Sequence, residues 1–197
     1  MCRFIETICF ENGEYPLLDL HQERVNRAFV SHFPGKPPHD LTQVLPWPEA
    51  TGRQKVRMVY DVDILEISVT AHVTRNVRKI LLLEGRTVEY AHKYEDRGEL
   101  QQLFDQRGEA DEILILKDGW VTDSFYANPA FWDGHSWYVP KTCLLDGVRR
   151  QHLLREGNVK MADISAQDLS DFQKVALVNA LVDLGECVLG AREGILR

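Results

Sequence analysis

The chain has 197 residues, 44% hydrophobic and 27% charged, which is typical of a globular protein with one large domain or two small ones. Its formal net charge of -7 argues against a nucleic-acid-binding protein, because phosphate backbones attract a basic surface. No apolar run reaches the roughly 18 residues of a membrane helix, and the first residues lack the apolar core of a signal peptide.

The first elements in chain order are a strand, a turn and a helix. Phe4–Phe10 is rich in apolar and β-branched residues and predicts a strand. The pair Asn12-Gly13 predicts a hairpin turn, with a returning strand over residues 15–18. Asp19 is a residue type that caps helices, so a helix is expected to begin there.

Two further strands complete a small α+β domain. Five prolines between residues 33 and 48 predict a loop with at most a short helix inside it. Residues 55–60 and 64–71 predict two strands with a tight connection. A polar break follows, so we expect a small N-terminal domain over residues 1–75 and a second domain over residues 76–197.

The second domain is predicted to contain many short strands and few helices. Extended segments are expected at residues 79–83, 88–93, 112–116, 120–123, 130–132, 137–139 and 175–178. Helices are expected at residues 96–105, 147–156 and 168–172. This meandering order favours a barrel-like sheet over a doubly wound one, so the fold class is predicted to be α+β.

Several motifs follow one another in an order that is typical of one family. In chain order they are Ile5-Glu6-Thr7, Gly13, His21-Gln22-Glu23-Arg24, Lys93-Tyr94-Glu95-Asp96-Arg97, residues 109–128, Gly147-Val148-Arg149-Arg150 and Val178-Asn179-Ala180-Leu181. This series resembles the class IV (fold type IV) pyridoxal phosphate-dependent enzymes and is most similar to aminodeoxychorismate lyase. The run from Glu109 to Asn128 is its most specific part. The resemblance implies a D-amino acid aminotransferase-like fold.

The resemblance also implies pyridoxal 5'-phosphate as cofactor and a role for each matched residue. Lys93 corresponds to the lysine that forms a Schiff base with the cofactor and shuttles protons. Arg24 corresponds to the phosphate-binding arginine, helped by the backbone N–H groups of Val148 and Arg149 at a helix start. Asp123 stands where the family usually has a glutamate beside the pyridine nitrogen.

The remaining matched positions are expected to line the cofactor or the substrate. Asn128 and Asn179 are implied to contact the cofactor. Glu6, Ala180 and Leu181 are implied to border the substrate. Asp61-Val62-Asp63 joins two strands directly where the family has a longer loop with a carboxylate-binding arginine. Arg57 or Tyr60, from the preceding strand, could replace that arginine.

Three functions remain open. The chain could be a lyase that splits 4-amino-4-deoxychorismate into 4-aminobenzoate and pyruvate, or an aminotransferase acting on a small amino acid. It could also be a degenerate member that binds the cofactor, or only a protein partner, without turnover. We expect a small-molecule substrate and no nucleic acid or membrane, and the resemblance implies a homodimer. The four cysteines form no CxxC pair and the seven histidines lack ligand spacing, so we expect reduced thiols in a cytoplasmic protein and no metal site.

Overall fold

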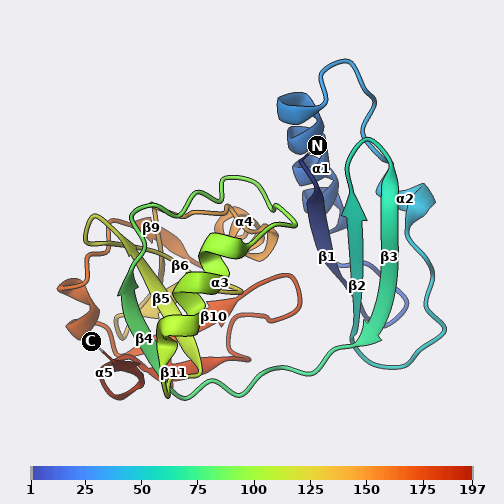
Figure 1. Ribbon diagram of the computed structural model, residues 1–197. Helices are drawn as coiled ribbons and strands as arrows, with labels where there is room; N and C mark the ends of the chain where they lie inside the picture. The colour runs from blue at the N-terminus through green and yellow to red at the C-terminus, as the bar shows by residue number, and fades with distance from the viewer. Residues whose placement is uncertain (1, 197) are drawn as a thin grey trace. The chain divides into compact units, whose positions relative to one another are not determined.

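The computed structural model describes residues 2–196, which divide into two compact units (Figure 1). The first unit contains the chain up to Val73 together with His92–Asp96. The second contains Thr74–Ala91 and the chain from Arg97 onward. Lys93 therefore groups with the first unit rather than with residues 76–197, because its segment is hydrogen-bonded to the N-terminal strand.

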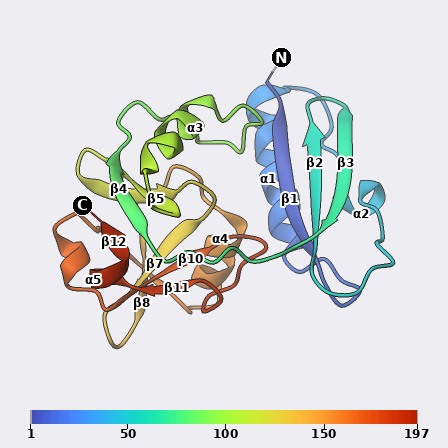
Figure 2. The same cartoon turned by 60° about the horizontal axis from the view of Figure 1, so that its bottom comes forward.

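The first unit is a three-stranded antiparallel sheet with a long helix on one face (Figure 2). The strands are β1 (Phe4–Phe10), β2 (Gln54–Tyr60) and β3 (Ile64–Ala71), in that order across the sheet. Helix α1 (Leu18–His32) packs on the sheet, and the short helix α2 (Leu41–Val44) lies in the proline-rich loop. Apolar side chains of α1, including Val25 and Phe29, share a buried core with the alternate β1 residues Phe4, Ile8 and Phe10.

The predicted returning strand and helix cap of this unit are wrong. Asn12 and Gly13 do form a turn with positive φ, but the chain then enters α1 without a second strand. Leu17 holds the N-cap position in a left-handed conformation, with φ of 71°, and within residues 2–196 no side chain caps the helix. Asp19 lies in the first turn, where its negative charge interacts favourably with the helix dipole, but its side chain does not cap the helix.

The second unit consists of two sheets and several short helices. The five-stranded sheet has the order β11-β10-β7-β8-β9, and the four-stranded sheet has the order β12-β4-β5-β6. Their strands are β4 (Ile80–Glu84), β5 (Glu112–Lys117), β6 (Trp120–Ser124), β7 (Asn128–Trp132), β8 (Trp137–Pro140), β9 (Lys160–Ala162), β10 (Lys174–Val178), β11 (Val188–Gly190) and β12 (Ile195–Leu196). The helices are α3 (Gly98–Phe104), α4 (Val148–Arg155) and α5 (Ala191–Gly194), with 3-10 turns at Asp105–Arg107 and Asp168–Ser170.

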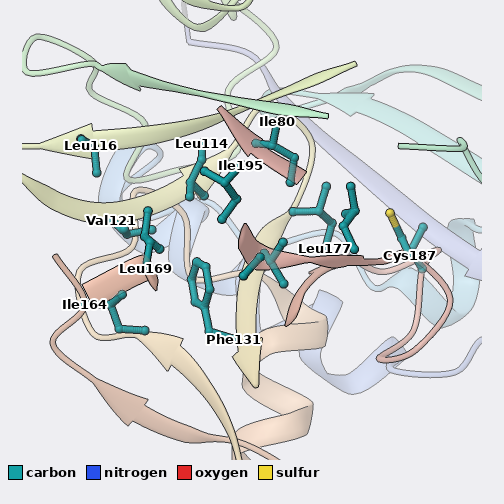
Figure 3. Packing of buried hydrophobic residues seen from close by; sticks show 14 residues of the cluster. Ile80, Leu114, Leu116, Val121, Phe131, Ile164, Leu169, Leu177, Cys187 and Ile195 are labelled. Carbon is teal, nitrogen blue, oxygen red and sulfur yellow. The ribbon is translucent and has the colours of Figure 1, made fainter. Parts of the chain in front are cut away.

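The two sheets of the second unit enclose one core (Figure 3). Leu114 and Val121 enter it from the four-stranded sheet, and Phe131 and Leu177 enter it from the five-stranded sheet. The alternate residues of β7 and β10, such as Ala130 and Ala176, lie on the other face, where α4 contributes Leu153. The strand at β10 is thus buried on both faces, which fixes the position of the turn that follows it.

Several predicted elements of the second unit differ from the structure. Residues 88–93 are not a strand, and the predicted helix over residues 168–172 is a single 3-10 turn. Strands β9, β11 and β12 and helix α5 were not predicted, because elements of two to four residues are too short to show a periodic pattern. Within the described residues, no helix is long and apolar enough to cross a membrane.

Candidate active site

The predicted site residues of the first unit centre on a buried carboxylate. Glu6 alternates with Phe4 and Ile8 on β1 and therefore points toward α1, where its side chain is 0% exposed. Arg24 of α1 donates from Nε to one Glu6 oxygen at 2.8 Å and from Nη2 to the other at 2.5 Å. His21, one helical turn earlier, places Nδ1 2.5 Å from Glu6 Oε2. The result is a bidentate ion pair with a histidine at its side.

The charges of this group follow from burial and pairing. Burial alone raises the pKa of the Glu6 carboxyl, but the charge and hydrogen bonds of Arg24, with those of His21, outweigh it and lower that pKa to about 2. Burial lowers the pKa of His21, against the opposing effect of Glu6. Glu6 is therefore anionic at neutral pH, and His21 is neutral and donates its Nδ1 hydrogen to it.

Lys93 lies in the segment His92–Asp96, which runs beside strand β1 of the first unit. The Ile5 N–H donates to the Lys93 carbonyl at 2.9 Å, and the Glu95 N–H donates to the Arg3 carbonyl at 2.9 Å. The ring of Tyr94 packs against that of Phe4, with centroids 5.3 Å apart. The positive charge of Lys93 is the smallest of the causes that lower the pKa of His21.

The two residues proposed to replace the missing family arginine have different surroundings. Tyr60 is buried in the core of the first unit, where burial and the Glu6 charge raise the pKa of its hydroxyl. Arg57 is half-buried and forms ion pairs with Glu66 at 3.4 Å and with Glu95 at 3.6 Å. Of the two, only Arg57 presents a charged group near the protein surface.

The second unit contains a separate group built around Asp123 at the end of β6. One Asp123 oxygen accepts a hydrogen bond from Asn128 Nδ2, and the other accepts one from the Leu144 N–H. Asn128 Nδ2 also donates to the Leu145 carbonyl at 2.9 Å. Burial raises the pKa of the Asp123 carboxyl to about 7, although these hydrogen bonds oppose it. Asp123 and Asn128 therefore hold the loop that leads into α4.

That loop brings the start of α4 close to Asn128. Gly147 precedes the helix, and a Cβ at this position would lie 2.2 Å from Asn128 Oδ1, so only glycine fits without movement. In the described part of the chain, no side chain caps the first turn, which begins with Val148 and Arg149. The N–H groups of a helix start are donors that suit an anion.

The last predicted segment forms a tight turn after β10. Asn179 and Val182 exchange backbone hydrogen bonds of 3.0 and 3.2 Å. The Asn179 side chain accepts from the Leu181 N–H at 2.8 Å and donates to the Tyr126 carbonyl at 3.3 Å. Its amide thus shapes the turn, while Ala180 is buried within it. The side chain of Arg149 donates to Asp183 at 3.1 Å, which ties this turn to α4.

The structure thus gathers the predicted residues into two groups, one in each unit. The first contains Glu6, Arg24 and Lys93, and the second contains Asp123, Asn128 and the start of α4. The direct bond between His21 and Glu6 was not predicted from the sequence. A signal for it existed, because His21 and Arg24 lie three residues apart on a helix and so face one side.

Comparisons with known proteins identify the family of this chain. The model of the family "Amino-transferase class IV" matches residues 90–188. A Haemophilus influenzae protein without a characterised function is 33% identical over 186 residues, which cover 92% of this chain and 98% of that protein.

Solved structures share the fold. A Haemophilus somnus protein, provisionally assigned as a 4-amino-4-deoxychorismate lyase, is 26% identical with a TM-score of 0.88, covering 93% of this chain and 98% of its own. A Mesorhizobium loti protein, provisionally assigned as an amino-acid aminotransferase, is 20% identical with a TM-score of 0.84 over 100% of both chains. The chain belongs to the class IV aminotransferases, a family of pyridoxal phosphate-dependent enzymes with the α+β fold type IV architecture.

Proposed function

We propose that this chain cleaves 4-amino-4-deoxychorismate into 4-aminobenzoate and pyruvate, with pyridoxal phosphate as cofactor. The observation that supports this activity best is the likeness to the Haemophilus somnus protein, which extends over 93% of the chain. The Glu109–Asn128 run, which resembles aminodeoxychorismate lyase, supports the same reaction.

The residues present suit the cofactor. Gly147 lets the start of α4 approach Asn128 closely, and the uncapped first turn offers N–H donors for a phosphate. The buried Asp123 carboxyl has oxygen acceptors for a protonated ring nitrogen, and the positive charge of that nitrogen would oppose the effect of burial, which raises the Asp123 pKa to about 7. We therefore propose that the N–H groups of Val148 and Arg149 bind the phosphate. The resemblance to the family assigns Arg24 to phosphate binding as well.

The proposed roles of the protein residues follow from their chemistry. The bound cofactor supplies an electron sink for the charge that develops on the substrate. Lys93 holds the cofactor and moves a proton at the substrate carbon that bears the amino group. Asp123 keeps the ring nitrogen protonated, and Asn128 and the Asn179–Leu181 turn border the bound molecules. Arg57 is the candidate for binding a substrate carboxylate.

The first experiment locates the cofactor. Purified protein is incubated with pyridoxal phosphate, reduced with borohydride and digested, and the labelled peptide is identified by mass. We expect the label on Lys93 and none in the Lys93→Ala variant. Lys117, a half-buried lysine paired with Glu89, offers a matched control, and Lys117→Ala should retain the label. A label at another residue would refute the assignment of Lys93.

The second experiment tests the reaction. Wild-type protein with cofactor is expected to release 4-aminobenzoate and pyruvate in equal amounts from 4-amino-4-deoxychorismate, and Lys93→Ala is expected to release neither. If the label is on Lys93 but no 4-aminobenzoate appears, the lyase proposal is wrong while the cofactor assignment stands.

An aminotransferase reaction is the second candidate, because the family includes this activity and the Mesorhizobium loti protein carries that provisional assignment. It predicts that a small amino acid converts the bound cofactor to its pyridoxamine form and releases the matching keto acid. Absence of a spectral change across a panel of amino acids would exclude it.

We further propose that the chain acts in the cytoplasm as a homodimer with a two-fold interface. The resemblance to class IV enzymes supports this assembly. Light scattering at micromolar concentration should give twice the chain mass of 22.7 kDa, and a monomeric mass would contradict the proposal.

A further inference from the structure

Glu6 was expected to border the substrate, but its surroundings leave no room for that role. Its side chain is 0% exposed, and both of its oxygens accept hydrogen bonds from α1. We infer that Glu6 is instead a positioning residue, which together with His21 orients the Arg24 guanidinium for a phosphate monoester. This inference rests on the proposed assignment of phosphate binding to Arg24.

The geometry of the pair defines how Arg24 is held. Glu6 engages Nε and Nη2 at once, so the guanidinium plane and the direction of its remaining N–H bonds are fixed by two contacts. Arg24 is 7% exposed, so its position depends on protein contacts more than on water. A guanidinium binds phosphate well only when its N–H groups keep a fixed direction, and the two contacts with Glu6 fix the direction of the Arg24 guanidinium.

The charges of Glu6 and Arg24 also support a role of this pair in orienting the guanidinium. Glu6 and Arg24 compensate each other, so the pair as a unit carries no net charge toward a phosphate. Phosphate recognition there depends on well-directed donors more than on long-range attraction. His21 adds a third contact to Glu6 at 2.5 Å from the same helix. Three side chains therefore hold one rigid arrangement between β1 and α1.

The alternative is an ion pair that serves only the fold of the first unit. If the pair is purely structural, its loss should weaken the affinity for every ligand equally. If it orients Arg24, its loss should weaken the affinity only for ligands that carry phosphate. Pyridoxal and pyridoxal phosphate differ in that group alone, and both can react with Lys93. The ratio of their affinities therefore isolates the contribution of the phosphate.

The test measures the dissociation constants of pyridoxal phosphate and pyridoxal by absorbance titration of the cofactor-free protein. Glu6→Gln keeps the shape of the side chain and removes its charge. We expect it to weaken the binding of pyridoxal phosphate at least about ten-fold, the low end of the loss seen when the outer partner of a metal ligand is removed, and to change the binding of pyridoxal less than about two-fold. Glu23→Gln, which removes a half-exposed carboxylate paired with Arg27 on the same helix, is the control and should change neither.

Equal affinities in Glu6→Gln and wild type, or an equal loss for both ligands, would overturn the inference. If Glu6→Gln does not fold, Glu6→Asp preserves the charge but shortens the side chain by one methylene, so it cannot keep both contacts. It should show the same selective loss of pyridoxal phosphate. A wild-type protein that fails to bind either ligand would instead refute the proposed function, so the two failures are distinguishable.

Discussion

Substituting Gly147 by alanine should disturb the start of α4 far more than the same change at Gly190. Both glycines precede a helix with extended backbone angles, φ of -68° and -63°, so alanine causes no backbone strain at either site. An added Cβ would lie 2.2 Å from Asn128 Oδ1 at the first site and 2.3 Å from Glu193 Oε2 at the second. The two clashes are similar in size, but the side chains that must move are different.

The cost follows from what each neighbour would lose. Glu193 is exposed and can turn into solvent, so Gly190→Ala should be neutral or stabilising by up to about 1 kcal/mol through the unfolded chain. Asn128 is buried and donates to Asp123 and to the Leu145 carbonyl. Displacing it removes two buried hydrogen bonds at about 1 kcal/mol each. The packing strain that it adds offsets the gain of up to about 1 kcal/mol through the unfolded chain, so the net loss is about 2 kcal/mol.

Urea unfolding followed by tryptophan fluorescence measures this difference, since three of the four tryptophans lie in the second unit. Gly147→Ala should lower the midpoint relative to wild type, and Gly190→Ala should not. We also expect Gly147→Ala to weaken pyridoxal phosphate, because the loop before α4 moves. Equal midpoints for the two variants would refute the claim that Asn128 is fixed against Gly147.

Three further predictions concern charge. The Glu6 pKa is about 2 in the folded protein, against 4.5 for a free glutamate side chain, so its ionised form stabilises the fold by about 3 kcal/mol above pH 4.5. This stabilisation is lost as pH falls toward 2, and acid unfolding of Glu6→Gln should lack this dependence. Burial raises the Asp123 pKa to about 7 in the folded protein, so Asp123 loses its proton at a lower pH in the unfolded chain. The free energy of unfolding of the wild type should therefore fall as pH rises from 4 to 7. The same slope in Asp123→Asn would contradict this. Arg57→Ala should change the free energy of unfolding by less than about 1 kcal/mol, because its ion pairs are partly exposed, but should raise KM at unchanged kcat. An unaltered KM would show that Arg57 does not bind substrate.

The parts of the fold that the sequence predicts well are those with a strong local pattern. Phe4–Phe10 and residues 64–71 are strands with the predicted bounds, and residues 112–116 and 120–123 are strands with one more residue each. The predicted start of α1 was wrong because Leu17, directly before the helix, adopts a left-handed conformation that its residue type does not favour. The fold type IV class came from the order of motifs, which is a signal of ancestry rather than of local physics.

The sequence likewise predicts one part of the candidate site and not the other. The order of motifs indicated which residues belong to it, but not what each side chain contacts, because contacts such as Asp123 with the Leu144 N–H join residues far apart in the chain. Asn179 was assigned to the cofactor, yet its amide groups bond to the Leu181 N–H and the Tyr126 carbonyl, a use that only the closed turn reveals.

Glu6 is the position where local reasoning could have gone further. A strand that alternates Phe4, Glu6 and Ile8 toward one face places a carboxylate on the face that forms the core. A buried carboxylate is tolerated only when it is paired and hydrogen-bonded, so a cationic partner on the packing helix was required. Arg24 is the cation on the buried face of α1, and His21 lies one turn before it on that face. The pairing was therefore deducible from burial and charge alone, and it is the observation that supports a role for Glu6 through Arg24 in place of a substrate contact.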